Sequence, residues 1–240
     1  MTRPVLLPLV LVLLASGCGL DSPAEPTPKE TPAPIQQTYP QQQDPQVLQS
    51  LYQEVLVTYQ SLQSLSADYD NRQTKGNEHY TATVHMKFAK PRKVRLDVTS
   101  CTDSLVSGAS IVWLGGTTIK GAKPIGPLTI RQEHKLSEKP CLRGWLFNQT
   151  DYDAMVQALL QGLPNGRYLG NARIGGQNLL MVEIPSRLSG VTLERIGIDP
   201  TKRLPVYREI RETAQGAPVF TTLYSKLVPN ASIAKDAFNL

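Results

Sequence analysis

Residues 78–99 constrain the fold most, because apolar and polar side chains alternate along them as in a strand with one buried face. The apolar positions of the first run are Tyr80, Ala82, Val84, Met86 and Phe88. The alternation breaks at Pro91, which cannot donate a ladder hydrogen bond, and resumes at Val94, Leu96 and Val98. These residues predict two antiparallel strands whose shared apolar face must be covered by other elements.

Helix and strand patterns follow along the rest of the chain. An apolar stripe at helical spacing predicts an amphipathic helix over residues 45–62, with Asp44 as its N-cap. Thr150 and Asp153 resemble a capping box before a second helix that ends at Gly162. Further strands are predicted at residues 67–73, 110–114, 117–120, 128–133, 167–174, 177–184, 191–199, 204–213 and 219–228, and a turn with a short helix at 232–238. Hairpin-linked strands with two helices predict an α+β fold, with the helices on one face of a large curved antiparallel sheet.

The N-terminal residues predict export. Residues 1–17 carry one positive charge, at Arg3, followed by an apolar run over residues 5–15. This is the layout of a signal peptide, and the run is shorter than the ~20 residues of a membrane-spanning helix. The segment LLASGC resembles the bacterial lipobox, whose cysteine, here Cys18, receives a diacylglyceryl group. We therefore expect a membrane-anchored extracytoplasmic lipoprotein; an ordinary signal-peptidase site beside an unmodified cysteine is the alternative.

Residues 18–43 are expected to tether a folded domain, residues 44–240, to that anchor. Six prolines fall between residues 21 and 43, among Gln, Thr and Ala. Such a composition buries too little apolar area to offset chain entropy and favours a semi-extended conformation.

Composition and motifs exclude several classes of function. The net charge of +5 is spread along the predicted strands without a basic, aromatic-rich stripe, so we expect no nucleic-acid partner. The sequence contains no HExxH, no GxSxG and no P-loop. His79, His85 and His134 are too far apart in the pattern to form a metal site. We therefore expect neither an enzyme nor a bound cofactor or metal.

Two further cysteines, Cys101 and Cys141, are expected to form a disulfide, because exported thiols usually oxidise. A redox-active pair is the alternative, but the spacing lacks the CxxC pattern of such sites.

The chain from residue 46 to residue 240 resembles the LolA/LolB-like family of periplasmic lipoprotein carriers. SLQSLSADYDN at residues 61–71 is similar to the family's opening motif, and MKFAKPRKVRLDV at residues 86–98 to its central hairpin. The ending, from IDPTKRLP at residue 198 onwards, is also similar in the order and spacing of its motifs. The resemblance implies an incomplete antiparallel β-barrel, with helices packed as a lid over an apolar cavity.

The resemblance also implies a role for the hairpin turn. In the soluble carrier, an arginine before the hairpin proline helps to hold the lid; Lys90 stands there in this chain and lacks the guanidinium fork. The soluble carrier has no anchor, so Cys18 makes this chain look closer to the anchored LolB-type acceptor and the LppX/LprG-type lipoproteins.

A cavity of this kind would bind the acyl chains of lipids or lipoproteins. The residues expected to line it are Met86, Phe88, Leu96 and Val98 of the hairpin and Leu51, Val55, Met155 and Leu159 of the helices. From periodicity alone these residues would form a filled core; the resemblance favours the cavity. We thus expect a monomeric carrier or acceptor of lipids in the cell envelope. The alternatives are an RseB/MucB-like sensor that binds a membrane protein, and a structural envelope lipoprotein.

Overall fold

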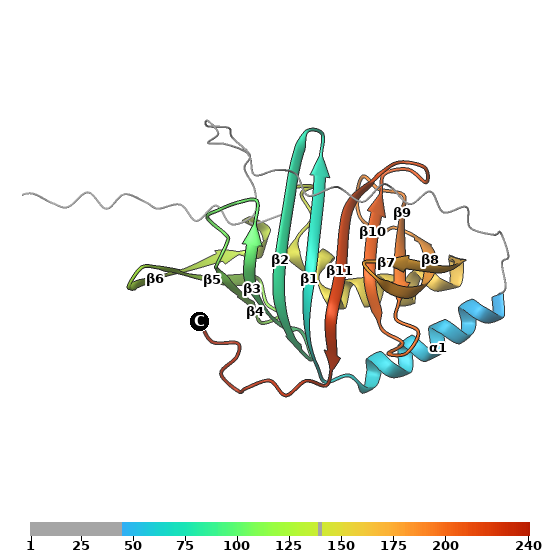
Figure 1. Ribbon diagram of the computed structural model, residues 1–240, viewed down its shortest axis with the longest axis horizontal. Helices are drawn as coiled ribbons and strands as arrows, with labels where there is room; N and C mark the ends of the chain where they lie inside the picture. The colour runs from blue at the N-terminus through green and yellow to red at the C-terminus, as the bar shows by residue number, and fades with distance from the viewer. Residues whose placement is uncertain (1–44, 139–140) are drawn as a thin grey trace, which may run out of the picture.

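The computed structural model describes residues 45–138 and 141–240. Eleven strands in these residues form one open antiparallel sheet with the order β6-β5-β4-β3-β2-β1-β11-β10-β9-β8-β7 (Figure 1). The strands are β1 (Ser64–Lys75), β2 (Glu78–Ala89), β3 (Lys93–Cys101), β4 (Ser110–Trp113), β5 (Thr118–Ile125), β6 (Leu128–Lys135), β7 (Arg167–Ile174), β8 (Gln177–Pro185), β9 (Leu193–Ile198), β10 (Pro205–Arg211) and β11 (Pro218–Pro229). The predicted α+β fold with a curved antiparallel sheet is confirmed.

Three α-helices accompany the sheet in the described part of the chain. They are α1 (Pro45–Ser61), α2 (Phe147–Thr150) and α3 (Tyr152–Gly162), with short 3₁₀ turns at Leu136–Glu138 and Leu163–Asn165. Figure 1 shows α3, in yellow, behind the middle of the sheet, and α1, in blue, beside the β7–β10 side. Contacts join α1 to α3, to β7 and to the turn at Leu163–Asn165, and its C-terminal end reaches the β2–β3 turn through Lys90.

The sheet consists of two meanders joined at its centre. Strands β1–β6 pair in chain order, as do β7–β11, and the two sets meet where β1 pairs with β11. Tyr69 lies opposite Tyr224 in this seam, with ring centroids 5.1 Å apart. The centre of the sheet therefore depends on pairing between residues more than 140 positions apart in the sequence.

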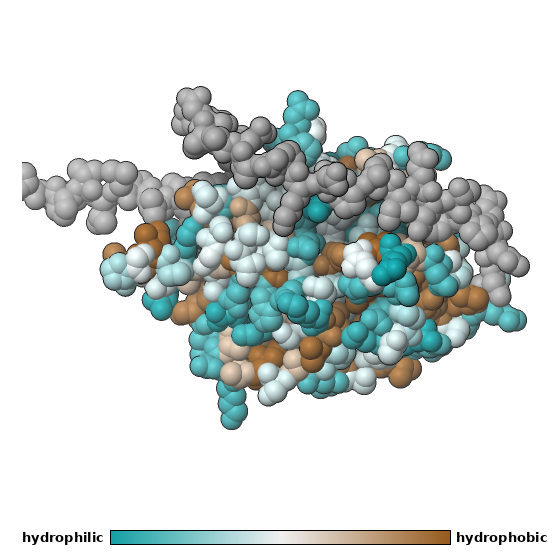
Figure 2. Space-filling view, viewed as in Figure 1, coloured by the Kyte–Doolittle hydropathy of each residue, from teal (hydrophilic) through white to brown (hydrophobic). Residues whose placement is uncertain are grey.

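The two faces of the sheet differ in polarity, as the alternation in residues 78–99 predicts. Val84, Met86 and Phe88 of β2 are buried, whereas the residues between them are only partly buried. Figure 2 shows the opposite face, where teal and white side chains predominate over the middle of the sheet. The apolar face is the one that carries α2 and α3, and we call it the concave face.

Local differences from the prediction lie at the ends of elements. The N-cap of α3 is Asp151, whose side chain accepts a hydrogen bond from the Ala154 N–H, and not Thr150. Thr150 instead belongs to α2, which the sequence did not predict. Residues 232–238 contain a turn but no helix. The predicted N-cap Asp44 lies outside the described residues.

Gly162 allows the end of α3 to lie directly on β8. A Cβ atom at this position would lie 2.7 Å from Cβ of Ile184, a branched atom that cannot rotate away. We therefore expect Gly162→Ala to lower the free energy of unfolding by about 1–3 kcal/mol, although alanine favours helices. Urea denaturation measures the change. Gly116→Ala is the control, since its Cβ would enter open space, and a similar loss in both variants would contradict this account.

Candidate functional site

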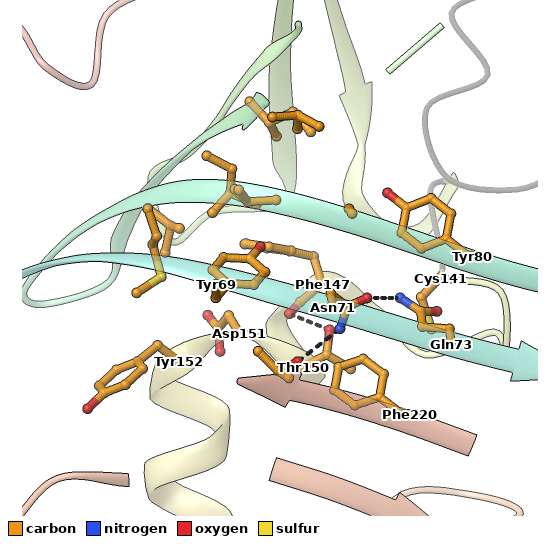
Figure 3. Close-up of a pocket in the computed structure, with 18 of the residues that line it drawn as sticks. Tyr69, Asn71, Gln73, Tyr80, Cys141, Phe147, Thr150, Asp151, Tyr152 and Phe220 are labelled. Carbon is orange, nitrogen blue, oxygen red and sulfur yellow. Dashed lines mark hydrogen bonds between the residues drawn. The ribbon is translucent and has the colours of Figure 1, made fainter. Parts of the chain in front are cut away.

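An apolar cavity of about 90 Å³ lies between the concave face of the sheet and the α2–α3 segment, which we define as α2 with the first turn of α3 (Figure 3). Its apolar wall comes from β2, β3 and β4. The main side chains of this wall are Val84, Met86, Val94, Leu96, Val98 and Ile111. Phe147 of α2 closes it from the other side and packs edge-on against Trp113, with centroids 5.6 Å apart.

The pairing register of β2, β3 and β4 places the side chains of the apolar wall next to one another. Met86 pairs with Leu96, and Leu96 pairs with Ile111, so three apolar side chains stand in a row across β2, β3 and β4. Val84 and Val98 form the next row. Cross-strand neighbours on one face pack against each other, and here they form a continuous apolar surface.

The other end of the cavity is polar. On β1, the concave-face positions change from Leu65 and Ala67 to Asn71 and Gln73. Nδ2 of Asn71 donates to Oγ1 of Thr222 on β11 at 2.9 Å, and Nε2 of Gln73 donates to Oδ1 of Asn71 at 2.9 Å (Figure 3). These buried amides satisfy one another, as buried polar groups usually do. The cavity is thus apolar at the β3–β4 end and polar near the β1–β11 seam.

Arg92, in the β2–β3 turn, holds the α2–α3 segment against the sheet. Its Nη2 donates to the carbonyl oxygen of Asn148 at 2.7 Å and to Oδ1 of Asp151 at 3.1 Å. Its Nε lies 3.1 Å from Oδ2 of Asp153, and its guanidinium stacks 5.0 Å from the ring centroid of Trp113. One side chain therefore joins the hairpin turn, the end of α2 and the start of α3.

Asp151 and Asp153 complete this contact from the side of α3. The Tyr59 hydroxyl of α1 donates to Oδ1 of Asp153. Burial raises the pKa of Asp151, and the adjacent Arg92 guanidinium opposes that rise. Burial and the hydrogen bond to Asp153 raise the pKa of Tyr59 well above its ordinary value. These groups link α1, α3 and the hairpin.

A second arginine supports the α2–α3 segment from β10. Arg208 and Glu194 are 2% and 1% exposed, and Nε of Arg208 donates to Oε2 of Glu194 at 2.8 Å. The other carboxylate oxygen of Glu194 accepts from Ser186, and Nη1 of Arg208 donates to the carbonyl oxygen of Gln149. The ion pair therefore has hydrogen-bond partners in both the sheet and α2.

Lys90, predicted to contact the lid, lies at the C-terminal end of α1. Its Nζ donates to the carbonyl oxygens of Tyr59 and Gln60 and lies 4.3 Å from the centroid of the Tyr59 ring. A cation at this end of a helix satisfies free carbonyls and favours the helix dipole. The contacts to α2 and α3, however, are made by Arg92, two residues further on.

Three of the eight predicted lipid-binding residues line the cavity: Met86, Leu96 and Val98. The other five are Leu51, Val55, Phe88, Met155 and Leu159, which are at most 4% exposed and belong to the packed core around α1 and α3. For these five, the filled-core alternative describes their surroundings in the structure.

Similarity to known proteins is confined to structure. Neither a protein-family model nor a curated protein matches the chain. Among solved structures, the lipoprotein LppX of Mycobacterium tuberculosis is 15% identical over 79% of this chain and 98% of LppX, with a TM-score of 0.47. A LolA superfamily protein of Nitrosomonas europaea is 10% identical over 80% of this chain and 97% of that protein, with a TM-score of 0.36.

The MucA/MucB complex of Pseudomonas aeruginosa is also similar, at 12% identity over 81% of this chain and a TM-score of 0.47. This chain spans 61% of that matched chain. The family that the sequence motifs resemble is therefore represented among the structural neighbours. At these identities and scores, no function is carried over from them to this chain.

The predicted disulfide is absent from the structure. Both thiols are free; Cys141 is buried at the polar end of the cavity, and Sγ of Cys101, at the end of β3, accepts a hydrogen bond from the Asp103 N–H at 3.4 Å. Burial raises the pKa of the Cys141 thiol. The bridge remains a prediction for the exported protein.

The predicted anchor, Cys18, the signal peptide and the tether lie outside the described residues. Within residues 45–138 and 141–240, no helix is both long and apolar enough to cross a membrane. The same residues contain no group of three or more His, Cys, Asp or Glu side chains that could hold a metal ion.

Proposed function

We propose that this protein is a membrane-anchored extracytoplasmic lipoprotein that binds acyl chains in the cavity and carries or accepts lipids or lipoproteins in the cell envelope. The observation that supports this most is the cavity itself, which has an apolar wall from three strands under a short helical cover. Burial of a hydrocarbon chain is favourable by about 0.8 kcal/mol per methylene, so even six methylenes contribute about 5 kcal/mol.

The size of the cavity implies that its walls move when a long chain binds. At about 90 Å³ it is smaller than an engineered cavity of roughly 150 Å³ that binds benzene, and ligand pockets commonly hold ~300–1,000 Å³. The α2–α3 segment is the proposed moving part. Polar contacts from Arg92 and Arg208 hold α2. Tyr152, in the first turn of α3, is buried against Phe88 and Tyr224 and would have to repack when the segment moves.

Cys18 and the tether would keep the binding domain close to a membrane. A semi-extended segment covers ~3 Å per residue, so residues 18–43 span up to roughly 80 Å. The domain would then reach lipids or lipoproteins at some distance from its own anchor.

A side chain that fills the cavity is expected to block binding. Val98 lies 5% exposed in the apolar wall, and Val98→Phe would place a ring in the space proposed for the chain. We expect the affinity for a fluorescent acyl probe to fall about tenfold, because the ring would occupy the space of roughly two methylene groups of the bound acyl chain. The free energy of unfolding should change by less than about 1 kcal/mol, since the ring enters existing space.

The matched control is Val57→Phe, the same substitution at a 62% exposed position of α1, which should leave probe binding unchanged. Native mass spectrometry of the wild-type protein should also show co-purified lipid. If the wild type neither takes up the probe nor carries lipid, the proposed function is wrong.

A further inference from the structure

The polar end of the cavity contains a carboxylate oxygen without a hydrogen-bond partner. The side chain of Asp151 is 1% exposed. Its Oδ1 accepts from Nη2 of Arg92 at 3.1 Å and from the Ala154 N–H at 2.8 Å. Its Oδ2 is buried and has no partner among the described residues. A buried acceptor in this state is costly, and such atoms in native proteins call for an explanation.

The groups around Asp151 do not supply a donor. Asn71 and Thr222, which line the same cavity, are hydrogen-bonded to each other. Figure 3 shows the Asp151 carboxylate beside the ring of Tyr69, and Tyr152 pointing away from it. Asp151 also lines the cavity, and its buried Oδ2 would become accessible to a guest when the α2–α3 segment moves as proposed above.

The charges around Asp151 restrict the kind of guest. The Arg92 guanidinium is shared between the Asp151 and Asp153 carboxylates, with an N–O distance of 3.1 Å to each. A second anion here would face two carboxylates, and a charged guest of either sign would lose its hydration in a buried site. A neutral group that donates a hydrogen bond avoids that cost.

Resting on the function proposed above, we propose that the polar end of the cavity binds a hydroxyl group through Oδ2 of Asp151. The guest would be a neutral, hydroxyl-bearing amphiphile, such as a monoacylglycerol or a long-chain alcohol. Its hydrocarbon chain lies along the apolar wall toward Leu96 and Ile111. Through Asp151, the cavity would bind such guests more tightly than ionised fatty acids or hydrocarbon chains without a hydrogen-bond donor.

Three guests with the same chain length test this selection. The full-length protein is titrated at pH 7.4 with 1-dodecanol, with 1-methoxydodecane, whose oxygen carries no hydrogen, and with dodecanoate. We expect the wild type to bind dodecanol at least about tenfold more tightly than the methyl ether, as for a hydrogen bond to a charged acceptor. Dodecanoate should bind more weakly than dodecanol.

Asp151→Asn is the informative variant. Asparagine still caps α3 through its side-chain oxygen, but its amide places a donor where Oδ2 was. We expect the preference for dodecanol over the methyl ether to disappear. Asp70→Asn is the matched control, because Asp70 is exposed and outside the cavity lining, and it should keep the preference. Circular dichroism checks that each variant is folded.

The outcomes separate this inference from the proposed function. If the wild type binds all three guests with equal affinity, as it would if a water satisfied Oδ2, the inference is wrong and the proposed function stands. Retention of the preference in Asp151→Asn would also overturn the inference. If no guest binds, both fail. The wild-type comparison requires no variant to fold.

Discussion

Replacement of Arg92 by methionine is expected to lower the free energy of unfolding by about 3 kcal/mol. The variant would leave the Asp151 carboxylate, which is 1% exposed, without the charge that balances it. It would also remove the hydrogen bond to the Asn148 carbonyl and the stacking on Trp113. The value lies at the lower end for buried ion pairs, because Arg92 itself is 31% exposed.

Urea denaturation followed by tryptophan fluorescence measures this change. Arg92→Lys keeps the charge but cannot reach the Asn148 carbonyl, Asp151 and Asp153 together, so we expect it to recover only part of the loss. Adding Asp151→Asn to Arg92→Met should return part of the stability, because no buried charge is then left alone. A loss below about 1 kcal/mol in Arg92→Met would show that the guanidinium does not hold the α2–α3 segment.

Arg208→Met is expected to be more damaging, with a loss of about 4 kcal/mol in the free energy of unfolding. Both members of the Arg208–Glu194 pair are almost fully buried, and breaking such a pair by removing one partner typically costs ~3–5 kcal/mol. The cost comes mainly from the Glu194 carboxylate, whose remaining hydrogen-bond partner among the described residues would be Ser186.

The double variant Arg208→Met with Glu194→Met distinguishes that cost from lost packing. With both charges removed, we expect most of the stability to return, since a buried ion pair and an apolar pair of similar volume often differ little. Thermal unfolding of the single and double variants provides the comparison. If the double variant is as unstable as Arg208→Met alone, the uncompensated Glu194 charge is not the cause.

The strands were predictable because their own residues alternate between apolar and polar side chains and are bounded by turn residues. In β2, Val84, Met86 and Phe88 alternate with polar residues, and the structure buries them on one face. Alternation and turn residues are local properties, so they identify a strand without knowledge of its partner. The same reasoning located α1 and the end of α3 at Gly162.

The short helix α2 and the cap of α3 were not predictable in this way. Four residues are too few to show a helical period, and Thr150 and Asp151 are both good capping residues. Asp151, which caps α3, also binds Arg92, which lies 59 residues away in the sequence. A contact between residues so far apart in the sequence does not affect the local periodicity from which helices and strands are predicted.

The cavity was predicted only in part for a related reason. Periodicity identified Leu96 and Leu159 alike as apolar and inward-facing, but one lines the cavity and the other is fully packed. The difference reflects where α3 packs, since it contacts the sheet mainly at β8 and β10. Asp151 was not identified from the sequence, and its free oxygen is visible only once the sheet above it is known.

The seam between β1 and β11 has a consequence for how the protein matures. Of the eleven described strands, β1 is synthesised first and β11 last. Until then β1 has an open edge, with its backbone donors and acceptors ready to pair with other chains. Pairing across such a long sequence separation is also slow. Until β11 pairs with β1, this open edge is therefore the part of the described sheet most exposed to aggregation.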